Sequence, residues 1–359
     1  MVGLIHPSDL TAWRRWQTRR RGVRGMIGVV RARRHPEATG LRLARGGDHP
    51  AILIAVESAS PSQQAALLAP LRHLPLEDVA VLLPESLTVP LPEHPWRTAP
   101  VTDLVHDPAL GDVSAVLAVG HFLPAGAAAH DLARARRLPF GVIQHGLLVP
   151  MAPPLPPAAH LLSWSRADGE FWTSGRTDVT VEVVGSQLLR EATVADAERL
   201  ARDRMIEWAA RRPIYLGQLH GAEIGRRRMV RAAERTIRRT NARYRPHPQE
   251  TDLLSRLVHR WWTRQGITFD RSGLPLPRLE APVIGVFSTG ILEAAARGLP
   301  AWVDFDRPPA WLGEFWERYG MSRLGGQPTA PPATSVGEPS AAVARWLLRA
   351  AGVTNEGDR

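Results

Sequence analysis

Short runs of almost continuous apolar residues alternate with segments of helical periodicity along most of this chain. Four such runs in the first half are AILIAVES, DVAVLLPE, VSAVLAVG and PFGVIQHG, and AAHLLSWS and DVTVEVVGS follow them. Strands that are buried on both faces have this continuous apolar character, and a helix between two consecutive strands makes them parallel. The pattern therefore predicts an α/β protein with parallel sheets.

The alternation restarts after a long amphipathic segment, Val194–Arg212, whose apolar spacing predicts a helix. Beyond it, PIYLGQLH, ARYRPHP, APVIGVFSTG and PAWVDFD are expected strands separated by helices. We expect two Rossmann-like lobes with an interdomain cleft. The expected divisions are a basic N-terminal segment at 1–50, a first lobe at 51–185, a second lobe at 186–325, and a Pro/Gly-rich loop with a closing helix at 326–359.

Missing residue types and motifs exclude several kinds of chemistry. The chain of 359 residues has no Cys and no Lys. Disulfides, thiolate nucleophiles, a P-loop Lys and a pyridoxal Schiff base are therefore excluded. No G-x-G-x-x-G follows the first strand, and neither G-x-S-x-G nor H-E-x-x-H occurs. We expect no nicotinamide enzyme, no α/β-hydrolase, no tightly held metal, and no cofactor apart from a nucleotide-activated substrate.

Positive charge is concentrated near the N-terminus. The formal net charge is +10, and residues 1–50 contain eleven Arg against three acidic residues. A solvated basic helix and loop is one interpretation. Contact of the Arg-rich residues 11–45 with an anionic membrane or glycan, or with nucleic acid, is the alternative. No apolar run approaches the roughly 20 residues that span a bilayer, and the N-terminal residues lack the apolar core that is typical of a signal peptide. We expect a cytoplasmic protein, with the inner membrane face as an alternative location.

Polar residues follow four of the expected strands, at the edge where parallel α/β sheets bind their ligands. In the first lobe these residues are Gln144, His145 and Gly146. In the second lobe they are Gln218, His220, Arg245, His247, Ser288, Thr289 and Gly290, with Glu293 one turn further along. A lone His at a strand end is more often structural, but four polar ends together indicate a binding site.

The chemistry that these residues indicate is anion binding. Ser288 starts a helix, where free amides and the helix dipole attract a phosphate, although an ordinary helix cap is the alternative. Arg245 can bind two phosphate oxygens, and His247 can donate to one. Pro246 and Pro248 keep the intervening loop extended. We therefore predict a phosphate site in the second lobe.

These motifs resemble those of the GT-B glycosyltransferases. QHG, VVGS, RPHP and STGILEAAARGLP are similar to motifs of bacterial enzymes with CMP- or CDP-activated donors, which include sialyl- and polysialyltransferases, capsule transferases and CDP-glycerol glycerophosphotransferases. The resemblance covers about residues 50–320. It implies that His247-Pro248 and Ser288-Thr289 bind the cytidine nucleotide and that His145 is the base. Asp168, in ADGE, departs from the acidic pair that supplies the base in the sialyltransferases.

The resemblance implies metal-independent transfer of a group from a CMP- or CDP-linked donor to a hydroxyl of a glycan, lipid-linked or small-molecule acceptor, in polysaccharide biosynthesis for the cell envelope. His145 would deprotonate the acceptor, with Gln144 or a nearby carbonyl orienting it. Arg245, His247 and the helix start would stabilise the leaving phosphate, and Glu293 would bind a ribose hydroxyl. Alternatives are a sugar-nucleotide epimerase or hydrolase of the same fold, an Arg-rich nucleic-acid or membrane-binding protein, and an inactive GT-B domain.

Overall fold

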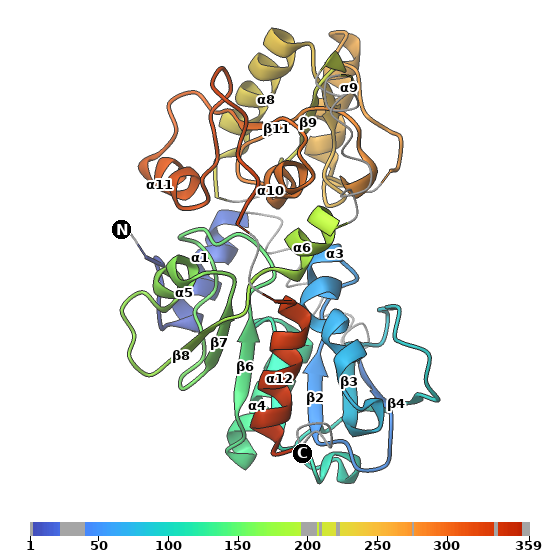
Figure 1. Ribbon diagram of the computed structural model, residues 1–359. Helices are drawn as coiled ribbons and strands as arrows, with labels where there is room; N and C mark the ends of the chain where they lie inside the picture. Colours follow the sequence, from blue (N-terminus) through green and yellow to red (C-terminus); the bar gives the residue numbers. More distant parts are fainter. Residues whose placement is uncertain are drawn as a thin grey trace. The chain divides into compact units, whose positions relative to one another are not determined.

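A computed structural model of the chain (Figure 1) describes the residues 3–21, 40–194, 207, 210–219, 223–274, 276–333 and 337–353. The chain divides into two compact units, Met1–Leu188 with Ser335–Arg359, and Leu189–Thr334. Each unit is built on its own largely parallel sheet. Among the described residues, no helix has both the length and the apolar character needed to cross a membrane.

The sheet of the first unit has eight strands in the order β4-β1-β3-β2-β5-β6-β7-β8. The strands are β1 (Leu41–Arg45), β2 (Ile52–Ala55), β3 (Val79–Pro84), β4 (Arg97–Val101), β5 (Ala115–Ala118), β6 (Phe140–Ile143), β7 (His160–Ser163) and β8 (Thr180–Val183). All pairs from β3 to β8 are parallel. β1 lies within the residues expected to form the basic N-terminal segment, 1–50, and is antiparallel to both β3 and β4. Only Leu43 and Ala44 of this strand are buried, so its sequence, LRLAR, lacks the continuous apolar run by which the parallel strands were predicted.

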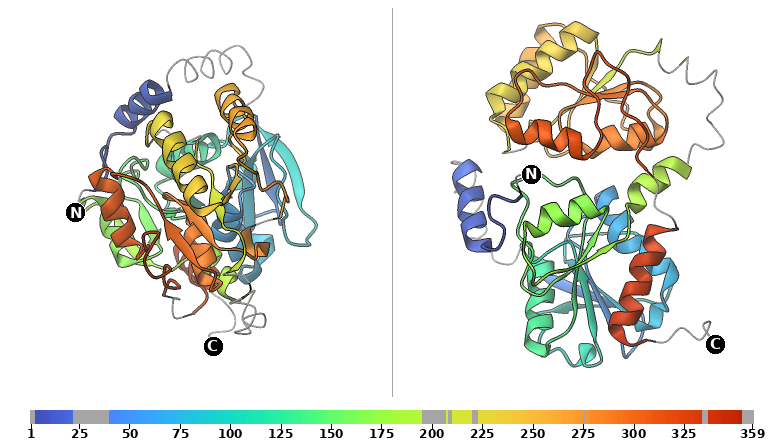
Figure 2. Two further views of the ribbon diagram at one scale, coloured as in Figure 1. Left: turned by 90° about the horizontal axis from the view of Figure 1, so that it is seen from above. Right: turned by 60° about the vertical axis from the view of Figure 1, so that its left-hand side comes forward.

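Helices cover both faces of this sheet (Figure 2). The helices of this unit are α1 (Leu10–Arg21), α3 (Pro61–Gln63), η2 (Gln64–Leu68), η3 (Ala69–His73), η4 (Leu76–Asp78), η5 (Pro108–Leu110), α4 (Pro124–Arg136), α5 (Arg166–Thr173) and α12 (Pro339–Ala351). A further helix, α6 (Gln187–Val194), begins at the end of the first unit, and most of its residues belong to the second. Leu53 and Ala55 of β2 belong to the core beneath α4, whereas Ile52 and Ile54 belong to the core beneath α12. Burial on both faces explains the continuous apolar runs of the central strands.

The N-terminal segment packs on the first unit. Trp13 of α1 is 5% exposed, and its indole N–H donates to the carbonyl of Met151 at 2.9 Å. Its ring lies edge-on to Phe122, with 5.5 Å between centroids. Burial of the large indole therefore fixes one side of α1, whereas Arg14, Arg15 and Arg19 are exposed, so the interpretation of a solvated basic helix stays a prediction. Residues 22–39 lie outside the described residues, so contact of residues 11–45 with membrane or nucleic acid stays a prediction.

The sheet of the second unit has four parallel strands in the order β10-β9-β11-β12. The strands are β9 (Ile214–Leu216), β10 (Arg243–Arg245), β11 (Val283–Gly285) and β12 (Ala301–Val303), and the helices are α8 (Arg226–Thr240), α9 (Leu253–Arg264), η6 (Leu276–Arg278), α10 (Thr289–Ala296) and α11 (Ala310–Arg318). The helix predicted for 194–212 lies largely outside the described residues. The chain runs from β9 outward to β10 and then returns to the other side of β9 at β11. This reversal is the topological switch point of the sheet, where open α/β sheets bind ligands.

Candidate functional site

The carboxyl ends of β9 and β11 meet at the switch point of the second sheet, and α10 begins there. Ser288 is the N-cap of α10, and its hydroxyl accepts a hydrogen bond from the Gly290 amide at 3.2 Å. Thr289 is the first helical residue and is half-buried. The first amides of a helix have no partner within the helix, and its dipole is positive at this end. Ser288 and Thr289 thus lie where an anion would bind.

Glu293 lies one turn into α10 and is 7% exposed. Burial raises the pKa of its carboxyl group to about 7, although the charge of Arg297 lowers it in part. Its carboxyl oxygens accept no hydrogen bond from the described residues. A buried carboxyl group without a protein donor can accept hydrogen bonds from hydroxyl groups of a ligand.

Gln218 and Gly290 serve the fold at this edge of the sheet. The side-chain oxygen of Gln218 accepts hydrogen bonds from the amides of Phe287 at 3.1 Å and Val286 at 3.4 Å, and so joins the ends of β9 and β11. A Cβ at Gly290 would lie 2.7 Å from Cδ1 of Leu216, so the absence of a side chain lets α10 pack against β9. These contacts account for both residue types without a ligand, and their predicted roles in binding stay predictions.

Arg245 and His247 lie at β10, on the side of β9 away from β11. The Arg245 guanidinium donates to Asp270 at 2.9 Å and also to the carbonyl of Leu274. Asp270 therefore neutralises the charge on which the predicted phosphate contact relied. Burial lowers the pKa of His247, although the charge of Glu250 opposes this shift. Their phosphate-binding roles stay predictions, and His220 lies outside the described residues.

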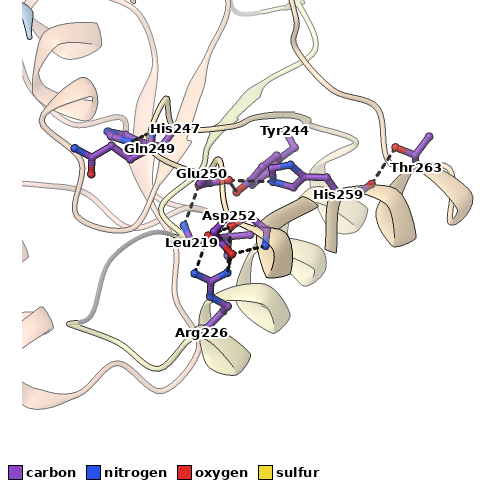
Figure 3. A network of polar contacts seen from close by, with 10 residues as sticks. Leu219, Arg226, Tyr244, His247, Gln249, Glu250, Asp252, His259 and Thr263 are labelled. Atoms are coloured by element: carbon purple, nitrogen blue, oxygen red, sulfur yellow. Dashed lines mark hydrogen bonds and ion pairs between the residues drawn. The ribbon is translucent and has the colours of Figure 1, made fainter. Parts of the chain in front are cut away.

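A buried carboxylate that the sequence analysis did not single out organises the loop after β10 (Figure 3). Glu250 accepts hydrogen bonds from the Tyr244 hydroxyl at 2.8 Å, the Leu219 amide at 2.9 Å and Nε2 of His259 at 3.0 Å. Burial alone would raise the pKa of Glu250, but the three donors lower it overall. Glu250 thus ties the ends of β9 and β10 to α9. The three donors are scattered along the sequence, so no local motif marks this cluster.

An ion pair beside it joins the starts of two helices (Figure 3). Arg226, the first residue of α8, donates to the two carboxylate oxygens of Asp252 at 2.9 and 3.1 Å. Asp252 is also the N-cap of α9, where it accepts from the Ser255 amide. An Asp three residues before a buried Ser, at the start of LLSRLVHRWW, is a capping signal that could have been found in the sequence.

In the first unit, Gln144 holds the loop that follows β6. It is 1% exposed, and its amide oxygen accepts from the Trp164 amide at 2.8 Å. Its side-chain nitrogen donates to the carbonyl of Gly146 at 3.0 Å. Gln144 therefore joins the ends of β6 and β7 as Gln218 joins the ends of β9 and β11. Its predicted role beside His145 stays a prediction, as does that of Gly146.

His145 is half-buried, and burial lowers the pKa of its imidazole to about 4. Its Nδ1 is buried and has no hydrogen-bond partner among the described residues. Together with Ser62, Gln187 and Ser340, it lines a pocket of about 10 Å³, roughly the room of one water molecule. A neutral imidazole with a free nitrogen can accept a proton, which is the chemistry that the predicted base requires.

Two other carboxylates of the first unit are engaged at helix starts. Glu57 follows β2, and its Oε1 accepts from the Gly126 amide in the first turn of α4 at 2.7 Å. This is the switch point of the first sheet, between β2 and β5, and burial raises the pKa of Glu57 there. Asp168, buried within α5, accepts from the hydroxyl of its N-cap Ser165. The carboxyl group of Glu57 thus binds the N-terminal end of α4. The corresponding end of α10 is capped by Ser288, which carries no charge.

Comparison with known protein families and with curated protein sequences finds no match for this chain. Solved structures are similar to it, among them the following two. UDP-GlcNAc 2-epimerase of Methanocaldococcus jannaschii, solved with UDP-GlcNAc and UDP, is 10% identical with a TM-score of 0.52, and the alignment covers 83% of this chain and 99% of that one. S. aureus MnaA, solved with UDP, is 13% identical with a TM-score of 0.53, and the alignment covers 85% and 98%.

This chain has their fold. It has two Rossmann-like lobes of the GT-B type, and the predicted fold class is confirmed. The resemblance to GT-B enzymes is thereby confirmed for the fold. The cytidine donor and the transfer of a sugar to an acceptor stay predictions.

Proposed function

We propose that this chain is a nucleotide-sugar enzyme whose second unit binds a uridine diphosphate sugar at the carboxyl ends of β9 and β11. The observation that carries the proposal is the start of α10 at the switch point of the sheet, capped by Ser288. The diphosphate would accept hydrogen bonds from the Thr289 amide and from the hydroxyls of Ser288 and Thr289, at the positive end of the α10 dipole. The carboxyl group of Glu293 would accept from a ribose hydroxyl. The two similar structures described above both contain UDP, which favours uridine over the predicted cytidine.

Inversion of a centre in the sugar is the reaction that we favour over transfer to an acceptor. The alignment with the UDP-GlcNAc 2-epimerase covers 99% of that enzyme, and this shared fold is what supports the epimerase reading. His145 in the first unit is neutral at pH 7, because burial lowers the pKa of its imidazole to about 4. A neutral imidazole suits proton removal in epimerisation and in transfer alike, so its state alone does not separate the two reactions.

Binding is tested by calorimetric titration of UDP into the wild type and two matched cap variants. Ser288→Ala removes a hydroxyl that the proposal places on phosphate, and we expect the affinity for UDP to fall roughly tenfold or more. Ser165→Ala removes the equivalent N-cap of α5 in the first unit, at a similar cost of about 1 kcal/mol in stability. It should leave UDP affinity unchanged. Equal losses in the two variants, or no UDP binding by the wild type, would reject the site.

The reaction is tested by proton NMR of UDP-GlcNAc incubated with the protein. Epimerisation gives a UDP-sugar with an inverted centre and no free UDP at early times. Release of UDP together with free sugar would identify a hydrolase. Consumption of the donor only when an acceptor glycan is added would identify a transferase. Either of the last two results would overturn the epimerase assignment without affecting the binding site at α10.

A further inference from the structure

The outer face of α9 carries a row of exposed apolar side chains. Leu253, Leu254, Leu257 and Trp261 are 63%, 54%, 48% and 44% exposed. Residues at these spacings lie on one side of an α-helix. Single exposed leucines are ordinary, but four large apolar side chains on one helix face form a continuous patch, and such patches mark interaction sites. We call these four residues the α9 patch.

The inner face of α9 is fixed to the second unit. Trp262 is fully buried, and its ring lies edge-on to Tyr244 with 4.8 Å between centroids. Ser255 is buried too, and His259 donates to Glu250 at 3.0 Å (Figure 3). Rotation of the helix to bury its leucines would break these contacts. The α9 patch is therefore a fixed part of the surface.

A row of arginines borders the patch. Arg256, Arg260 and Arg264 follow one another at four-residue spacing along α9 and are exposed. None of the three forms an ion pair with a described residue, and α9 contains no Asp or Glu. The helix therefore presents leucines and a tryptophan beside unneutralised guanidinium groups. Such a helix, with a basic stripe beside an apolar one, is typical of segments that lie in a membrane interface.

We propose that α9 binds the surface of an anionic membrane, with its axis parallel to the bilayer. The α9 patch would enter the boundary between head groups and acyl chains, and the three arginines would reach lipid phosphates. A second copy of the chain fits less well, since a symmetric contact brings the same arginines against each other. Nucleic acid would neutralise the arginines but leave the leucines exposed.

This surface differs from the one predicted from the sequence. That prediction placed membrane contact on residues 11–45, but of the two tryptophans at their start Trp13 is 5% exposed and packs in the first unit, and Trp16 is half-buried. Trp261, by contrast, is exposed together with three leucines. The described residues therefore favour the second unit as the membrane-binding part.

The test is co-sedimentation of the full chain with phosphatidylcholine vesicles, with and without phosphatidylglycerol. We expect binding only to the anionic vesicles, weakened by added salt. Arg256→Gln/Arg260→Gln and, separately, Leu257→Gln/Trp261→Gln should each lower the partition coefficient by roughly 10–30-fold. The controls are Arg227→Gln/Arg231→Gln, which removes two exposed arginines of α8, and Val183→Gln, at a site 51% exposed in the first unit. Both should bind as the wild type does.

Thermal melting of each variant shows that it is folded. Absence of binding to anionic vesicles, or equal losses in the controls, would overturn the proposal. So would a concentration-dependent dimer that Leu257→Gln/Trp261→Gln abolishes in sedimentation velocity, which would assign the α9 patch to a second copy. Binding to RNA without binding to vesicles would also overturn it.

Discussion

Burial shifts the pKa values of Glu293 and His145 in opposite directions for one reason. Removal from water disfavours the charged form of either group. The pKa of the Glu293 carboxyl rises to about 7, and that of the His145 imidazole falls to about 4. At neutral pH the first is partly protonated and the second is uncharged. Each residue therefore makes the free energy of unfolding depend on pH, and the two dependences have opposite signs.

For Glu293 the folded-state pKa lies above the unfolded value. Its contribution to stability is fully present below about pH 4.5 and is lost as the pH rises through 7. Glu293→Gln removes this loss, so we expect the variant to have a higher free energy of unfolding than the wild type at pH 8, by about 1–3 kcal/mol, and a similar one at pH 4. Urea denaturation at the two pH values measures this. A difference independent of pH would contradict the raised pKa.

For His145 the folded-state pKa lies below the unfolded value. Stability is therefore present above about pH 6.5 and is lost as the pH falls towards 4. His121 acts in the same direction, because burial lowers its pKa to about 4 as well. We expect the free energy of unfolding of His145→Gln to fall less than that of the wild type between pH 7 and pH 4.5. The part of the loss that His121 causes should remain in the variant. Identical pH profiles of unfolding in the variant and the wild type would contradict the lowered pKa of His145.

At the scale of elements, the side chains of buried glutamines join loops and strand ends that the strand-to-strand hydrogen bonds of the sheets do not connect. The amide oxygen of each accepts backbone N–H groups, with Gln63 bound to Glu57 and Ser58, Gln144 to Trp164, and Gln218 to Val286 and Phe287. The sequence pattern places Gln144 and Gln218 at strand ends. A ligand contact and a backbone contact cannot be told apart from that pattern, because the bonded amides lie about 20 residues away for Gln144 and almost 70 for Gln218.

Replacement of Gln218 by Met keeps the side-chain volume but leaves the amides of Val286 and Phe287 without their acceptor. We expect a loss of about 1–3 kcal/mol in the stability of the second unit, together with weaker UDP binding because α10 follows these residues. Gln249→Met, at an exposed position nearby, is the control and should be nearly neutral. Urea denaturation compares the two variants. A Gln218→Met variant as stable as its control would refute the structural role.

For the whole molecule, alternation of apolar runs and helical segments was enough to predict two Rossmann-like lobes, because that signal is local. The antiparallel strands β1 and β4 were not predicted, nor was the packing of the C-terminal helix α12 on the first unit. Both depend on contacts between distant parts of the chain. Trp346 of α12 lies against Gly141 of β6, where a Cβ would approach its ring to 2.6 Å. No sequence pattern near residue 346 predicts its contact with Gly141.

Trp346→Ala should therefore destabilise the first unit by about 3–5 kcal/mol. The second unit should keep its stability, because residues 335–359 belong to the first unit alone. Pulsed proteolysis in urea, with the fragments assigned by mass spectrometry, separates the two unfolding events. Equal destabilisation of both units would contradict the assignment of α12.

The most direct test of the nucleotide site is hydrogen–deuterium exchange with and without UDP. We expect slower exchange with UDP in peptides that cover residues 286–296, where β11 ends and α10 begins. Exchange at the start of α4, where Glu57 already accepts from the Gly126 amide, should not change. Unchanged exchange over 286–296 at saturating UDP, or protection at α4 instead, would contradict a nucleotide site at α10.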